Sequence, residues 1–367
     1  MRVERDIAGF ALPFTVGIMT ATIRILPVSY LNPFPSALMT AAVFIPVSFL
    51  IHPKHKRLSG NLISILATLS AFFCGLTTGL THNAMSICDG VSGFTSSTVT
   101  HMLAGMKARI DALPFRNQDT NALLTALLTG DRSGIPPNIT EYFRASGASH
   151  ILALSGLHLG IIYSIINKTL SIIGNSRTAM KTRSLGVVAI CSIYTVATGA
   201  GASIVRALIY IVTGEICRFT GRHRSGKHIL CTALVIQLSL FPSDIRSVSF
   251  QLSYAAMAGI TYIYPWIRNL WPDSLSKGVL GFIWNSAAIS ISCQLTTAPL
   301  AWIYFRSMPI YFILTNLIAV PLTGIIISSA VICIALAGIG TCPETMTRAT
   351  EGLVQTLTAA LEVISSM

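Results

Sequence analysis

Long apolar runs recur along the whole chain, and most approach the length of a helix that crosses a bilayer. Such a helix needs about 20 consecutive, mainly apolar residues. The runs lie at 7–26, 35–51, 60–81, 148–172, 185–200, 203–217, 229–241, 248–267 and 279–300, and the region 309–340 holds one or two more. The pattern predicts an all-α protein, a polytopic transmembrane helix bundle of about ten spans.

Several of these runs are short or are broken by Gly or Pro. Irregular backbone persists at membrane depth only where it is buried in protein or lines water. We therefore expect broken or re-entrant helices that line a cavity within the bundle.

Amphipathic helices are predicted outside the spans. An apolar stripe over residues 123–128 has the helical period, and Gly130 can end that helix. Pro136-Pro137 prevents its continuation, and a second short helix follows. We expect this pair of helices on the outer membrane surface. The stretch 349–366 is also amphipathic, but its acidic charges differ from those of a lipid anchor, so we expect it to pack against the bundle.

Composition supports the membrane interpretation. Of the 367 residues, 52% are hydrophobic and only 10% are charged, with a mean hydropathy of +0.68. Soluble domains average about 25% charged residues. This composition excludes a soluble enzyme and indicates that lipid covers much of the surface.

The net charge of +12 comes mainly from basic residues in alternate short loops. Cytoplasmic loops of membrane proteins carry an excess of Lys and Arg. One set of loops is rich in them, whereas the alternate short loops contain only Arg246 and Arg306. We therefore expect a multi-pass protein of the bacterial cytoplasmic (inner) membrane with a cytoplasmic N-terminus, and we interpret the basic excess as an orientation signal.

The sequence predicts no cofactor and no metal. The eight cysteines form no CxxC pair, and six of them lie in or beside apolar runs, where a free Cys behaves as a small hydrophobe. No nucleotide-binding motif occurs. The segment 198–201 lacks the Lys-Ser/Thr that a phosphate loop requires, and it predicts a tight turn between helices.

Polar groups inside apolar runs are costly and usually serve a purpose. Ser155 and His158 are three residues apart and share a helix face. A Ser–His pair allows a hydrolase interpretation, although no acid lies near enough in sequence to orient the imidazole. For His158 and for His150, the alternatives are hydrogen bonding within the bundle and a position along a water-lined path.

Arg206 keeps its charge in any protein environment. At bilayer depth its guanidinium must reach the interface, pair or face water. Glu215 is nine residues further on, on the opposite helix face, so the two cannot pair within one helix. Arg206 therefore reaches the interface, pairs structurally elsewhere or contacts a passing phosphate.

Two further polar groups have both structural and functional interpretations. Gln251 lies near the outer end of its run, where interhelical hydrogen bonding is the structural alternative. Pro321 frees a carbonyl and kinks its helix, and Asn316 can satisfy the broken turn.

These residues, in this order, resemble the channel domain of the ComEC family of DNA-uptake proteins. One matching segment is Phe-Arg-Ala-Ser-Gly-Ala-Ser-His-Ile-Leu-Ala-Leu-Ser-Gly-Leu-His at 143–158, and its part from Gly147 to His158 is the most specific. The other matching segments are 126–133 with Thr-Gly-Asp-Arg, Val-Arg-Ala at 205–207, Arg218, Phe-Pro at 241–242, Phe-Gln-Leu-Ser-Tyr-Ala at 250–255, and Asn-Leu-Ile-Ala-Val-Pro at 316–321. The resemblance covers about residues 120–325.

The resemblance implies a non-enzymatic pore that admits single-stranded DNA to the cytoplasm. Such a strand needs cationic guides and surfaces on which its bases can stack. Tyr142, Phe143 and Tyr254 are the candidates for stacking. The candidate path residues are Asp131, Arg132, Arg144, His150, Ser155, His158, Arg206, Gln251, Tyr254 and Asn316.

The resemblance also implies a division of the chain. We expect a three-span segment at 1–81, a short extracytoplasmic segment at 82–119, the channel domain at 120–340 and an amphipathic helix at 341–367. Family members often carry an outer OB-like domain and a metallo-β-lactamase-like nuclease, but 82–119 is too short for an OB barrel and no HxHxDH motif occurs. The expected partners are single-stranded DNA, the lipid bilayer, a separate DNA receptor, nuclease and cytoplasmic ATPase or helicase, and a second copy in a homodimer. The alternative functions are transport of another, anionic solute and intramembrane hydrolysis by Ser155 and His158.

Overall fold

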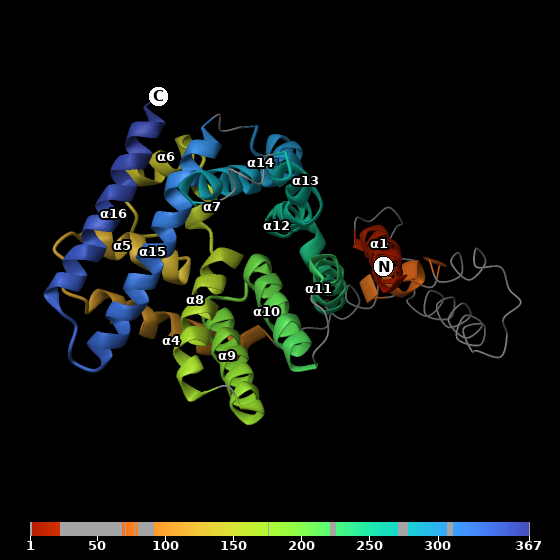
Figure 1. Ribbon diagram of the computed structural model, residues 1–367, viewed down its shortest axis with the longest axis horizontal. Helices are drawn as coiled ribbons and strands as arrows, with labels where there is room; N and C mark the ends of the chain where they lie inside the picture. The colour runs from red at the N-terminus through yellow and green to blue at the C-terminus, as the bar shows by residue number, and fades with distance from the viewer. Residues whose placement is uncertain are drawn as a thin grey trace, which may run out of the picture. The chain divides into compact units, whose positions relative to one another are not determined.

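The computed structural model is made of helices (Figure 1). It describes residues 2–22, 68–69, 71–76, 78–79, 92–174, 176–220, 225–270, 278–306 and 311–366. Every regular element within these ranges is helical, which confirms the all-α prediction. The expected span at 35–51 and most of the span at 60–81 lie outside the described residues.

Two of the described helices are long and apolar enough to cross a bilayer, α14 (Gly278–Phe305) and α15 (Phe312–Gly338). The region 309–340 therefore contributes one long helix. Shorter apolar helical stretches occur at Phe10–Thr20 and in α11 (Gly226–Leu240). The expected total of about ten spans stays a prediction, because most other described helices fall below the length and hydropathy of a full span.

The chain divides into two compact units, the first formed by residues 1–93 and 216–254 and the second by residues 94–215 and 255–367. The expected boundaries near residues 81, 119 and 340 stay predictions.

The first unit contains α1 (Arg2–Thr22), α11 and the 3-10 helix η3 (Pro242–Arg246). Helix α1 packs against α11. It also meets the helical residues 71–76, where a Cβ added at Gly17 or Gly75 would overlap the backbone of the other segment. These two glycines thus let two helical backbones touch, as small residues do in membrane helix pairs.

The second unit holds most of the remaining elements. They are α4 (Ser92–Asp111), α5 (Gln118–Thr129), α6 (Pro137–Ala145), α7 (Ser149–Leu152), α8 (Gly156–Thr169), η2 (Leu170–Ile173), α9 (Arg177–Ala197), the π-helix η4 (Gly259–Ile263), α13 (Tyr264–Arg268), α14, α15 and α16 (Glu344–Ser365). Helix α10 (Ala202–Thr220) lies in this unit as far as residue 215, and α12 (Val248–Ala258) enters it at residue 255.

The main core of the second unit joins α5, α6, α7, α15 and α16 through buried apolar side chains such as Leu127, Phe143, Ile326 and Leu357. The leucine stripe of α5 is part of this core, and the helix ends at Gly130 with a left-handed φ of 81°, as predicted. The second short helix also forms, with Pro137 in its first turn.

Helix α16 packs along α15 and also meets α6 and α5 (Figure 1). Val354, Leu357 and Leu361 supply its buried face. The expected packing of the C-terminal amphipathic stretch against the bundle is therefore confirmed.

A second apolar cluster joins α8, α9 and α10 through Leu159, Val187 and Ile204. The tight turn predicted at 198–201 connects α9 to α10, with left-handed φ values of 83° at Gly199 and 49° at Ala200. The continuous run expected at 148–172 is instead divided, because α7 ends at Leu152 and α8 begins at Gly156.

Candidate functional site

The first turn of α8 is fixed by a reciprocal capping arrangement between Ser155 and His158. Ser155 Oγ accepts the N–H of Leu157 at 3.3 Å, and His158 Nδ1 accepts the N–H of Ser155 at 3.2 Å. Such a box satisfies backbone donors that a helix start would otherwise leave unpaired. It explains why the chain leaves α7 and restarts as α8 at this point.

The cap also determines the tautomer of His158. A backbone N–H can only donate, so Nδ1 must accept, and a neutral imidazole then carries its hydrogen on Nε2. Only 1% of His158 is exposed, and among the described residues its Nε2 has no hydrogen-bond partner. The ring therefore presents a buried N–H donor that lacks an acceptor in the described chain.

The hydrolase interpretation of Ser155 and His158 finds no support in this geometry. The hydroxyl of Ser155 lies 2.9 Å from Nδ1 and also accepts a backbone N–H. In a triad an acid holds the other ring nitrogen. Here that nitrogen is Nε2, and no carboxylate of the described chain bonds it.

Arg206 lies against the same turn. It extends from α10, is 7% exposed, and its Nη2 sits 3.2 Å from the position that a Cβ on Gly156 would take. Gly156 therefore lets the guanidinium approach the first residue of α8. A helix N-terminus carries partial positive charge, so the guanidinium of Arg206 lies beside the positive end of α8.

Glu215 of α10 is held by other helices. Tyr163 of α8 donates its hydroxyl to Oε1 at 2.6 Å, and Ser184 of α9 donates to Oε2. The carboxylate is buried. The sequence analysis excluded pairing of Arg206 with Glu215 within the helix but did not predict these two partners. The signal for a buried hydrogen-bonded carboxylate was the presence of an acidic residue within an apolar run.

Asp131 and Arg132 follow α5. Asp131 forms an ion pair with Lys107 of α4 and accepts the N–H of Ser133 at 2.9 Å. The Lys107 ammonium and these hydrogen bonds lower the pKa of Asp131 to about 2. Arg132 is exposed and donates from Nε to the carbonyl of Leu152, which ties this loop to α7.

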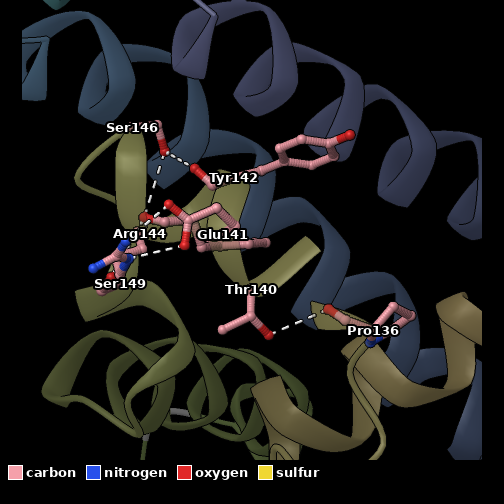
Figure 2. Close-up of polar contacts among 8 residues, drawn as sticks. Pro136, Thr140, Glu141, Tyr142, Arg144, Ser146 and Ser149 are labelled. Carbon is pink, nitrogen blue, oxygen red and sulfur yellow. Dashed lines mark hydrogen bonds and ion pairs between the residues drawn. The ribbon is translucent and has the colours of Figure 1, made fainter. Parts of the chain in front are cut away.

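The exposed charges of α6 pair locally. Arg144 forms two hydrogen bonds with Glu141, at 2.9 and 3.0 Å (Figure 2). The guanidinium lowers the pKa of the Glu141 carboxyl. Tyr142 points away from that pair (Figure 2). It donates its hydroxyl to Glu362 of α16 at 2.8 Å, which raises the pKa of the phenol.

The prediction that Phe143 stacks on a base is wrong, and the path candidate His150 lies at the surface. Phe143 is fully buried in the core, so it has no face free for a nucleic-acid base. His150 is exposed, and its Nδ1 lies 3.1 Å from the carbonyl oxygen of Gly147.

Gln251 and Tyr254 belong to a polar network in the first unit. Tyr254 donates its hydroxyl to Gln237 at 3.1 Å, and Gln237 donates to Asp244 at 2.9 Å. Gln251 donates to the carbonyl of Ile245 at 2.9 Å. The sequence analysis did not predict Gln237 and Asp244 as members of a polar network, because their partners lie on neighbouring elements rather than on their own helix.

Asn316 lies near the start of α15, and its Oδ1 is buried without a hydrogen-bond partner in the described chain. Thr323, two turns further on, has a buried Oγ1 in the same condition. Helix α15 continues through Pro321, whose ring nitrogen cannot donate to the preceding turn. This helix therefore carries several polar atoms that the described chain leaves unsatisfied.

The structure thus brings Ser155, His158 and Arg206 together at the start of α8. Asp131, Arg132, Arg144 and His150 lie on surface loops and short helices of the same unit. Gln251 and Tyr254 belong to the other unit. Among the described residues no group of three or more His, Cys, Asp or Glu side chains is placed to hold a metal ion.

The family pattern described as "Competence protein" matches residues 127–367, about two thirds of the chain. The chain belongs to the competence protein family. The matched region of this competence protein begins within α5 and includes α8, Arg206 and both apolar helices α14 and α15. Competence-family proteins are membrane proteins, and the two apolar helices are consistent with that setting.

Two curated relatives extend the comparison. The competence protein is 24% identical over 228 residues to "Uncharacterized protein YcaI" of Escherichia coli, covering 61% of this chain and 29% of the relative. It is 23% identical over 206 residues to "ComE operon protein 3" of Bacillus subtilis, covering 55% of this chain and 25% of the relative. The chain thus spans less than a third of either relative, and no solved structure matches it.

Proposed function

We propose that this competence-family chain is a transmembrane channel that passes single-stranded DNA across the bacterial cytoplasmic membrane during natural transformation. The supporting observation is the cluster of positive groups at the start of α8. Arg206 lies against Gly156, and the buried Nε2–H of His158 belongs to the same helical turn. This arrangement fits an anion that carries its charge into the protein interior.

A phosphate diester suits this cluster for two reasons. A guanidinium donates in a fork that matches phosphate oxygens, and a helix N-terminus favours negative charge. A buried N–H without an acceptor costs about 1–3 kcal/mol, so an acceptor that arrives with the strand relieves that cost. The passing phosphate expected for Arg206 is thus chemically reasonable at this point.

The family assignment supports nucleic acid as the transported anion. The chain belongs to the competence protein family, and one relative is named "ComE operon protein 3". Single-stranded DNA combines regularly spaced phosphates with bases that stack on aromatic rings. In this proposal Arg132 and Arg144 attract the strand at the surface, and Arg206 contacts it deeper.

The remaining parts of the proposal follow from the sequence pattern. We place the N-terminus in the cytoplasm because Lys and Arg concentrate in one set of loops. A DNA receptor, a nuclease and a cytoplasmic ATPase or helicase stay the partners that we propose for the uptake step. A second copy of the chain is a further expected partner.

Replacing Arg206 tests the proposal. The full chain is reconstituted in liposomes, and entry of a fluorescent single-stranded oligonucleotide is measured for the parent, Arg206→Ala and Arg206→Lys. We expect entry to fall roughly a hundredfold for Arg206→Ala, equivalent to about 2.7 kcal/mol, and less for Arg206→Lys, which keeps the charge but loses the fork. Lys168→Ala is the matched control, because Lys168 is an exposed basic residue of α8.

Unchanged entry in Arg206→Ala would remove this cluster from the mechanism. Flux of phosphate or another small anion, with no entry of the oligonucleotide, would instead favour the anionic-solute transporter. Equal membrane levels and equal unfolding temperatures of the variants ensure that the comparison reports on passage.

A further inference from the structure

Helix α16 has a polar exposed face. Its buried side faces the core, whereas the outward positions include Arg348, Gly352, Gln355, Thr356 and Glu362. A Cβ added at Gly352 would meet nothing within 4 Å. Val363 is the one large aliphatic residue among the exposed positions of α16.

Helix α16 runs beside the apolar helix α15 for most of its length, with its buried side against α15. At one end of the α15–α16 pair, Cys333 Sγ of α15 lies 3.7 Å from Thr350 Oγ1 of α16. At the other end, residues 142–146 bridge the two helices, because Tyr142 bonds Glu362 of α16 and the carbonyl of Ser146 accepts the hydroxyl of Thr315 in α15. The two helices are thus antiparallel neighbours (Figure 1).

The contacts place α16 at the depth of the membrane-crossing part of α15. Residues 315 to 333 of an α-helix extend about 27 Å at about 1.5 Å per residue, close to the roughly 30 Å thickness of a hydrocarbon core. Helix α15 is the most apolar of the candidate spans. A helix attached along this length shares its depth in the bilayer.

Helix α14 shows what a lipid-facing surface looks like in the same unit. Its exposed positions are large and apolar, among them Val279 with 76% of its surface exposed, Phe282, Leu295 and Ile303. Lipid covers such residues without cost. The exposed face of α16 has the opposite character, and polar groups at bilayer depth must be satisfied by protein or water.

We propose that the exposed face of α16 faces water at bilayer depth and lines the path of the strand, an inference that rests on the function proposed above. Thr356 donates its hydroxyl to the carbonyl of Gly352 within the helix, whereas water satisfies Gln355 and hydrates the Arg348–Glu344 ion pair, whose carboxylate also binds Arg116. A neighbouring protein helix would have to desolvate that pair, whose side chains are 56% and 63% exposed. The face carries small and polar side chains, which leaves room for a hydrated strand.

Cysteine accessibility tests this inference. Gly352→Cys, Gln355→Cys and Thr356→Cys are made in the full chain, reconstituted in liposomes and treated with a membrane-impermeant methanethiosulfonate. The cysteine thiolate, which forms in water and not in lipid, attacks the sulfenyl sulfur of the reagent and displaces methanesulfinate. Leu357→Cys on the buried face of α16 and Leu295→Cys on the exposed face of α14 are the controls, and the parent chain measures labelling of the native cysteines.

We expect the three exposed-face variants to react roughly tenfold faster or more than Leu295→Cys. A single-stranded oligonucleotide at saturating concentration should slow their labelling several-fold without affecting labelling of the parent. Use of three positions keeps the test valid if one variant fails to fold, and all variants are compared at equal membrane levels.

Labelling as slow as that of Leu295→Cys would mean that lipid or a second protein helix covers the face, and would overturn the inference. Fast labelling without protection by the oligonucleotide would overturn α16 as part of the strand path. Neither outcome removes the proposed function, which depends on oligonucleotide entry in the parent and in Arg206→Ala.

Discussion

The guanidinium of Arg206 occupies the space that the missing side chain of Gly156 leaves open, with Nη2 3.2 Å from the position of a Cβ. One residue of α8 thereby determines how closely a buried positive charge approaches the start of that helix. The position of Arg206 can therefore be changed without changing Arg206 itself.

Gly156→Val should displace the guanidinium and reduce oligonucleotide entry almost as far as Arg206→Ala does. A branched side chain at this point collides with Nη2 and with the Cβ of Ala207, which lies 3.4 Å from the position that the new Cβ would take. Entry of labelled oligonucleotide into liposomes measures the effect. Gly160→Val is the matched control, because a Cβ at Gly160 of the same helix meets nothing within 4 Å. Equal loss of entry in both variants would show that helix propensity, rather than Arg206, is responsible.

Ser155→Ala should lower stability while leaving the channel largely functional. The substitution removes the side-chain cap of α8, and loss of such a cap costs about 1 kcal/mol. The unfolding midpoint in detergent measures this cost, and Ser164→Ala, at an exposed site of α8, should change it little. A serine-directed probe that labels the parent but not Ser155→Ala would support the hydrolase instead.

Gly17→Ala and Gly75→Ala should each destabilise the first unit by about 1–3 kcal/mol, because the added methyl group enters a backbone contact. Gly105→Ala in α4 provides the comparison, since a Cβ there meets nothing within 4 Å. In a helix interior that control should be neutral or stabilising by about 0.5–1 kcal/mol. Thermal unfolding of the three variants distinguishes the sites, and a similar shift for all three would exclude close packing as the cause.

The ion pair of Asp131 with Lys107 should contribute stability at neutral pH and lose it in acid. The pKa of Asp131 is lowered to about 2 in the folded chain, whereas an unfolded Asp titrates near about 3.9. The contribution is therefore fully present above about pH 4 and disappears as pH falls through about 2. Because the pair is partly exposed, we expect less than about 1 kcal/mol.

Unfolding midpoints at pH 6 and pH 3 measure this contribution. The difference in stability between the parent and Asp131→Asn should shrink as the pH falls, since the variant cannot titrate at this position. A difference that stays constant with pH would indicate that the interaction does not depend on the charge of Asp131.

The features that sequence predicted well are those with local causes. Gly130 ends α5 because it adopts a left-handed φ of 81°, and Pro137 begins α6 because its fixed φ suits a first turn. The leucine stripe of α5 and the apolar face of α16 follow from helical period alone. These signals lie within a few residues of the feature that they determine.

The features that sequence missed depend on distant partners or an unusual cap. Glu215 bonds residues 52 and 31 positions away, and no spacing rule connects them. The break before α8 was hidden because His158 occupies the capping-box position that usually holds Glu or Gln. The number of spans and the assignment of path residues stay predictions, since both depend on how helices meet around a cavity.

The π-helical turn η4 sets the rotational position of the helix that follows it directly, α13. Gly259 in this turn lies against the backbone of Ser292 in α14, where a Cβ would overlap, and Tyr264, just beyond the turn, donates its hydroxyl to Asn285 of α14 at 3.2 Å. Each residue of a regular helix turns the chain by about 100°. Deleting a single residue between 259 and 263 would restore regular winding and swing Tyr264 away from Asn285. The additional residue in the π-helical turn thus rotates α13 into the orientation in which it packs against α14.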